Sequence, residues 1–242
     1  MNQRFDLSSI LREWPEVPGS MTVRLLRLDD GRVVLQRRVA LGVIQMETTG
    51  RPDGLRPAGH ESVLADFRTR GRLDADRLPD HEIDAAEREA ALYLHRAVAM
   101  AALGEIEAVI RDSEHVRSLA MIGNGASGEL RSAALARLSV QAILLAVRAE
   151  VVGALREPGS GSAVEAIDRG LAALEAALAR SGSISPIDSS WSDALRSLRA
   201  ALVPKLPASQ REELRERLEA AIRTENFELA AILRNELRQM LP

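Results

Sequence analysis

Carboxylates and histidines at helical spacing are the residues with which this chain could bind a metal. Asp112 and His115 stand three positions apart, like the Glu-x-x-His pair of helical bundles that hold two metal ions, and Glu105 and Glu150 could add ligands. A two-metal site needs such a pair twice, and the sequence has it once. We therefore expect no metal and no cofactor, and we expect His115 to be solvated or hydrogen-bonded within a helix layer.

Other catalytic patterns are equally incomplete. The glycine-rich stretch at residues 123–128 could hold an anion at a helix start, but no strand precedes it and the lysine of a phosphate-binding loop is missing. We interpret it as a loop between helices. No Gly-x-Ser-x-Gly motif and no cysteine occurs, and His95 beside Tyr93 fits a partly buried helix position. The sequence therefore predicts no catalytic residue, which favours a non-enzymatic protein.

A group of arginines near the N-terminus could contact a phosphate backbone. Arg24, Arg27, Arg37 and Arg38 lie in a stretch of alternating character, where a shared face would carry positive charge. Against this, the net charge is -3 and aromatic residues make up 2%, which leaves little for stacking on bases. Nucleic-acid contact through these four arginines stays open as the alternative function.

These arginines belong to a predicted antiparallel β element. Apolar and polar residues alternate on both sides of Asp29-Asp30-Gly31, a strong hairpin signal, and a third strand or strand-like return runs from Leu41 to Glu47. A small ribbon of this kind is marginal in water, so we expect it to lie on helices.

The middle of the chain is rich in alanine and leucine and predicts helices. One helix ends at Gly71, Asp80 caps a longer one, and the stretch from Leu130 to Leu155 is apolar on more than one face, as a central helix would be. We expect an irregular antiparallel helical bundle or a degenerate tetratricopeptide-like array. No stretch approaches the roughly 18 consecutive apolar residues of a membrane span, so we expect no membrane contact and a cytoplasmic location.

The chain therefore divides into three predicted parts and is mainly α. Residues 1–58 form a small β-containing N-terminal segment, residues 59–204 the helical bundle or repeat-like region, and residues 205–242 a helical hairpin. Prolines at 204 and 207 mark the last boundary.

The stretch from Ser209 to Met240 carries two short amphipathic patterns on either side of a polar turn. Ser209 with Glu212 forms a capping pair that predicts a helix start, and Asn226 is a second candidate cap before a stripe that begins at Phe227. Two helices joined by so short a turn must be antiparallel neighbours. A hairpin of this size buries little apolar surface, so it needs the body of the protein or a partner.

This stretch resembles the UVR domain of the excision-repair proteins UvrB and UvrC and of regulators of bacterial Clp proteases. The resemblance rests on Leu218, Ala221, Glu225, Phe227, Glu228, Ala230, Ala231, Leu233 and Arg234. The usual acidic residue after that arginine is Asn235 here, which puts in question any contact that the family makes through it. Residues 35–54 together with the hairpin also look like a group of bacterial proteins, planctomycete ones among them, with a small N-terminal segment, a helical middle and a UVR domain. That second resemblance implies no activity.

The UVR resemblance implies a hairpin that pairs with a second hairpin, in another copy of the chain or in a partner protein. A homodimer is one form that such pairing can take. Packing of the hairpin on its own chain is the other interpretation. The expected partner-binding residues are Leu218, Ile222, Glu225, Phe227, Glu228, Ala231, Arg234 and Leu237. The sequence thus favours a bacterial interaction protein, with a DNA-repair accessory factor as the alternative.

Overall fold

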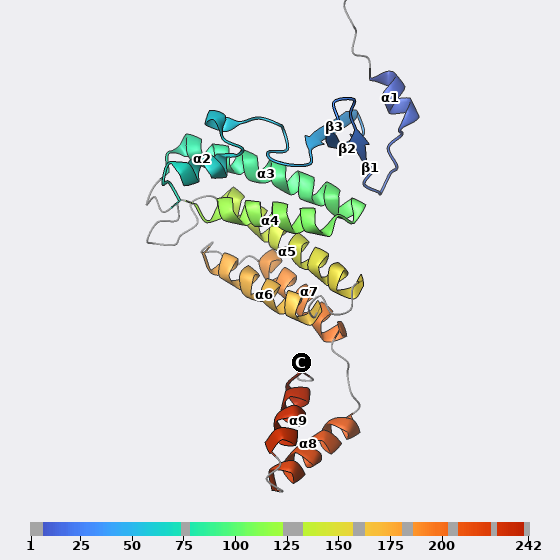
Figure 1. The fold of residues 1–242 in the computed structure, drawn as a ribbon, viewed down its shortest axis with the longest axis vertical. Coiled ribbons are helices and arrows are strands. Elements are labelled where there is room, and N and C mark those ends of the chain that lie inside the picture. The colour runs from blue at the N-terminus through green and yellow to red at the C-terminus, as the bar shows by residue number, and fades with distance from the viewer. Residues whose placement is uncertain are drawn as a thin grey trace, which may run out of the picture.

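The computed structural model describes residues 7–73, 78–122, 133–156, 163–180, 186–202, 208–223 and 227–239. Helices dominate these residues, and three strands near the N-terminus form a small antiparallel sheet. The chain is mainly α with a small β element, as its composition and periodicity predict. Figure 1 shows the helices stacked in chain order, with the sheet beside α3.

The sheet follows the short helix α1 (Ser8–Glu13) and has the order β1-β2-β3. Its strands are β1 (Val23–Arg27), β2 (Val33–Val39) and β3 (Gly42–Glu47). Gly31 has φ +84° in the turn between β1 and β2, a conformation that glycine adopts without strain. Leu35 lies opposite Leu25 and Met46, and both Leu35 and Met46 are buried. They pack in one cluster with Ala99. The helices thus support the ribbon, as expected.

A succession of helices follows the sheet, and each long one packs against the next. After the turn η1 (Pro57–Gly59) come α2 (Val63–Thr69), α3 (Asp80–Leu103), α4 (Ile106–Ala120), α5 (Ala133–Arg156), α6 (Ala163–Arg180) and α7 (Pro186–Leu202). Gly104 ends α3 in the left-handed conformation. The predicted cap at Asp80 is wrong: Pro79 holds the cap position without a side-chain bond, and Asp80 is the first helical residue.

Helix α5 is the centre of this stack. It packs against α4 on one side and α6 on the other, and it also contacts α3. Among the described residues, α5 is also the one helix whose length and composition would allow it to cross a membrane. The sequence expectation used a different criterion, an uninterrupted apolar run, and Arg137 and Arg148 interrupt this helix. Contact with several helices accounts for apolar residues on more than one face, such as Leu135, Ile143 and Val151.

The C-terminal hairpin has a core of its own. Helices α8 (Ala208–Arg223) and α9 (Phe227–Gln239) pack against each other. Among the described residues, their buried cluster holds Ala221, Ala230 and Leu233 and includes no residue of the preceding helices. The predicted pair of helices is present, with the first one starting a residue before Ser209.

Candidate partner-binding site

The described interior of the hairpin is small. Ala221 on α8 and Ala230 and Leu233 on α9 are buried, and Leu214 and Leu218 pack partly buried against them. Of the three buried side chains described in the hairpin, two are alanines, so the described part of its core contains little apolar surface. A helix pair with such a core gains stability when a further surface covers it.

Apolar residues remain exposed on both hairpin helices. Ile222 on α8 is 53% exposed and Ile232 on α9 is 55% exposed. Leu229 precedes Ile232 by three residues, so these two lie on the same face of α9, and Leu229 is also exposed. Burial of an isoleucine or leucine side chain contributes roughly 1.5 to 3 kcal/mol. These side chains are therefore the largest source of binding energy that the described hairpin offers.

The residues predicted to bind a partner fall into three groups. Ile222, Ala231 and Arg234 are exposed, so a partner can reach them. Leu218 and Leu237 are half-buried, and Leu218 packs in the hairpin's own core. Glu225 and the side chains of Phe227 and Glu228 lie outside the described residues.

Two exposed residues were missed by sequence reasoning. Leu229 and Ile232 stand outside the stripe on which the prediction was based, because they flank the buried positions Ala230 and Leu233. The signal was present in the sequence, since α9 has apolar residues on a second face one turn apart. An amphipathic helix that packs only within its hairpin would have polar residues there.

The four N-terminal arginines do not share one face of the sheet. Arg24 lies opposite Gln36, and Val23 lies opposite Arg37. Because side chains alternate along a strand, Arg24 and Arg38 are on one face, and Arg27 and Arg37 are on the other. The sheet thus divides the positive charge between its two faces.

Two of these arginines are engaged within the chain. Arg38 is buried and donates hydrogen bonds to the carbonyl oxygens of Trp14 (2.8 Å), Gly42 (3.1 Å) and Val39. Arg24 stacks on the Trp14 ring at 4.1 Å and donates to the Gln36 side chain at 2.9 Å. Both side chains therefore hold the segment after α1 against the sheet. Arg27 is exposed and Arg37 half-buried.

A buried ion pair joins α3 to α4. Arg96 and Asp112 are 1% and 0% exposed as side chains, and two bonds of 2.7 and 2.8 Å link the guanidinium to both carboxylate oxygens. The remaining nitrogen of Arg96 donates at 2.8 Å to the carbonyls of Glu47 and Gly50. Arg111 also reaches Asp112. This cluster ties the end of β3 to the helix pair, and it occupies the aspartate considered above as a metal ligand.

A second buried carboxylate, Glu89 of α3, organises the neighbouring segments. It accepts hydrogen bonds from the backbone N–H groups of Val63 (2.7 Å) and Leu64 (3.2 Å) at the start of α2. Its oxygens also lie 3.4 Å from Arg51 and 2.9 Å from His115 Nε2. An anion at a helix start is favoured by the helix dipole. His115 is therefore hydrogen-bonded between helices, one of the two environments expected for it.

Tyr93 completes this polar cluster. Its ring stacks on His115 with centroids 3.6 Å apart, and the Arg96 guanidinium lies 4.9 Å from its centroid. Burial, with a smaller contribution from the Glu89 carboxylate, raises the pKa of Tyr93 to about 12. Within the described part of the chain, no three histidine, aspartate or glutamate side chains come together as a metal site. The contacts of the cluster connect α2, α3, α4 and the turn after β3.

Comparison with known families identifies the hairpin. The model of the UvrB/uvrC motif, UVR, matches residues 208–240, which include α8 and α9. This confirms the resemblance inferred from the sequence. The motif is associated with DNA-repair proteins and with protein interaction. We found no match among curated proteins and none among solved structures.

Proposed function

We propose that this chain is a non-enzymatic protein–protein interaction protein that acts through its UVR-like hairpin. The observation that carries the proposal is the exposure of Ile222 and Ile232 on a hairpin whose described core holds two alanines and one leucine. Partner residues that cover these isoleucines would supply the burial that the isolated hairpin lacks. The proposal assigns no catalytic role to Asp112 or His115, because each is bound to a charged residue of α3.

The partner is a second helical hairpin of similar chemistry, in another copy of the chain or in another protein. Helices pack on helices when both present an apolar stripe. Charged residues beside the isoleucines, such as Arg223 and Arg234, are exposed and would set the orientation at the rim of the contact.

The test is the double variant Ile222→Asp/Ile232→Asp in the full chain. Both positions are exposed, so the hairpin should keep its own core. In the complex, the partner would bury both isoleucines, so their replacement should weaken pairing by roughly a hundredfold or more. Sedimentation analysis measures pairing with a second copy, and affinity capture from native cells measures pairing with another protein.

Leu41→Asp is the matched control, because Leu41 is 92% exposed and lies in the turn between β2 and β3. It removes the same kind of exposed apolar side chain far from the hairpin in sequence. If the double variant and the control keep the same mass and capture the same proteins, the hairpin is not the interaction site.

The alternative is a DNA-repair accessory factor that contacts nucleic acid through the sheet. The association of the UVR motif with DNA-repair proteins favours it. Arg27 and Arg37 would supply the contacts, because Arg24 and Arg38 are engaged within the chain. This alternative predicts duplex or single-strand binding that decreases steeply with salt. Absence of a shift of labelled DNA at low salt would remove it.

A further inference from the structure

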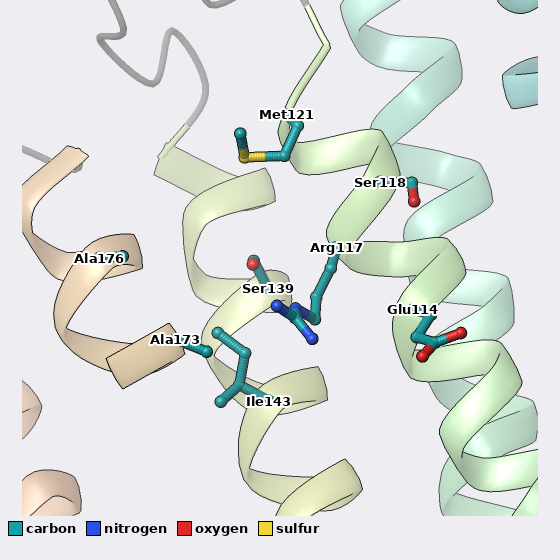
Figure 2. Close-up of a pocket in the computed structure, with 8 residues that line it drawn as sticks. All are labelled: Glu114, Arg117, Ser118, Met121, Ser139, Ile143, Ala173 and Ala176. Carbon is teal, nitrogen blue, oxygen red and sulfur yellow. The ribbon is translucent and has the colours of Figure 1, made fainter. Parts of the chain in front are cut away.

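A groove separate from the hairpin lies on the helix stack, at the C-terminal half of α4 and the N-terminal half of α5. It lies over α5, between α4 and α6, and has a volume of about 450 Å³. The buried residues Ser139 and Ile143 form its floor (Figure 2). One wall comes from α4, with Glu114, Arg117, Ser118 and Met121, and the other from α6, with Ala173 and Ala176. Its volume is in the range of natural ligand sites, roughly 300 to 1,000 Å³.

Small residues on α6 determine the shape of this groove. Gly170 brings the backbone of α6 against α5, because a Cβ there would stand 2.1 Å from Val147 Cγ2. One and two turns later, the wall consists of the methyl groups of Ala173 and Ala176. A larger side chain at Ala176, which is exposed, would fill the groove without entering the core.

The groove combines a guanidinium group, that of Arg117, with an apolar surface. Figure 2 shows the Arg117 guanidinium extended over the floor near Ser139 and Ile143. No acidic residue in the described part of the chain pairs with Arg117. Other arginines of the helix stack do form ion pairs. Arg169 of α6 lies 2.5 Å from Glu150, and Arg199 of α7 lies 2.6 Å from Asp168.

The arrangement determines which ligand is complementary. A carboxylate at Arg117 would form charge-assisted hydrogen bonds, and Ser118 and Ser139 also line the groove. An aliphatic side chain would pack on Ile143 and Met121. Glu114, one turn earlier on α4, repels a second negative charge at that end. The groove therefore fits one carboxylate beside one aliphatic group.

We propose that this groove binds a short peptide segment of a partner protein, with a leucine or isoleucine anchor next to a single aspartate or glutamate. Binding of this kind adds a second site to the chain, and the site does not depend on the hairpin. The protein would then hold one partner at the hairpin and another on the helix stack.

The test begins with random dodecapeptides displayed on phage and selected on the full chain. The expected result is enrichment of peptides with Leu or Ile near Asp or Glu. A labelled selected peptide is then titrated against the full chain by fluorescence anisotropy. Ala176→Trp should weaken binding at least tenfold by filling the groove. Arg117→Glu should weaken it by roughly ten- to a hundredfold, and replacing the peptide's acidic residue with Lys should restore binding to that variant.

Leu41→Asp, at the exposed position between β2 and β3, is the control, and it should leave peptide binding unchanged. The proposal is overturned if no peptide is enriched, if the selected peptides are basic, or if binding survives Ala176→Trp. It is also overturned if Ala176→Trp lowers the mass of the protein in light scattering, because the occupant of the groove would then be a second copy of the chain. A failure here leaves the hairpin experiment unaffected.

Discussion

The buried ion pair between Arg96 and Asp112 allows a quantitative prediction. In Asp112→Ala, the guanidinium stays buried without its carboxylate, and loss of one partner of such a pair costs roughly 3 to 5 kcal/mol. Arg96 keeps its two bonds of 2.8 Å to the carbonyls of Glu47 and Gly50. Because these bonds remain in the variant, we expect the free energy of unfolding to fall by about 3 kcal/mol, the lower end of that range.

The assay is urea-induced unfolding followed by far-ultraviolet circular dichroism, with the free energy of unfolding compared between variants. Glu175→Ala is the control, because it breaks the ion pair of 3.0 Å between Arg196 and Glu175, which is largely exposed. A surface pair of this kind contributes about 1 kcal/mol or less. If the two variants lose the same free energy, the Arg96–Asp112 pair does not stabilise the fold as its burial implies.

Two further predictions concern Tyr93 and Gly170. Tyr93 is the single tyrosine, and its pKa of about 12 in the fold exceeds the ordinary value of 10.0. As the pH rises, Tyr93 therefore loses its proton in the unfolded chain before it does so in the folded protein. The contribution of the neutral, buried Tyr93 to the free energy of unfolding is complete below pH 10.0 and is lost as the pH rises towards 12. Absorbance titration of the folded protein with a midpoint near 10.0 would contradict it. Gly170→Ala should destabilise the protein by roughly 1 to 3 kcal/mol through its clash with Val147. Gly153→Ala is its control in a thermal melt, because a Cβ there makes an ordinary contact of 3.5 Å with Ile106. Equal melting temperatures for the two glycine variants would refute the close approach of α5 and α6.

Local pattern was sufficient to predict most of the fold. The β1–β2 turn follows from Asp29-Asp30-Gly31, and the central position of α5 follows from its apolar residues on several faces. The hairpin follows from two amphipathic stripes and a short turn, and the family comparison confirms its type. Each of these features depends on neighbouring residues, which a sequence displays directly.

The polar cluster could not be predicted in the same way, because its partners are far apart in sequence. Arg96 donates to a carbonyl 49 residues away, and Glu89 caps a helix that begins 26 residues before it. The spacing of Asp112 and His115 on α4 resembled half of a metal site. Their actual partners come from α3, and no local pattern indicates which helix will face them.

The sequence already contained the information that the four N-terminal arginines cannot share one face of the sheet. Arg24 and Arg27 are three residues apart, and Arg37 and Arg38 are adjacent, so in any strand each pair must be divided between two faces. The alternation that predicted the strands therefore also predicted the division that the register shows.

The position of α5 in the stack has a consequence for synthesis of the chain. During translation, α5 leaves the ribosome before the residues of α6 and α7 that cover Ile143, Val147 and Val151. Until α6 and α7 have been synthesised, the long apolar helix α5 exposes an apolar face to solvent. A nascent chain in this state aggregates or recruits chaperones. A chain that stops after Arg156 would keep that side permanently uncovered. We therefore expect the folding machinery of the cell to be needed most while residues 157–202 are being made.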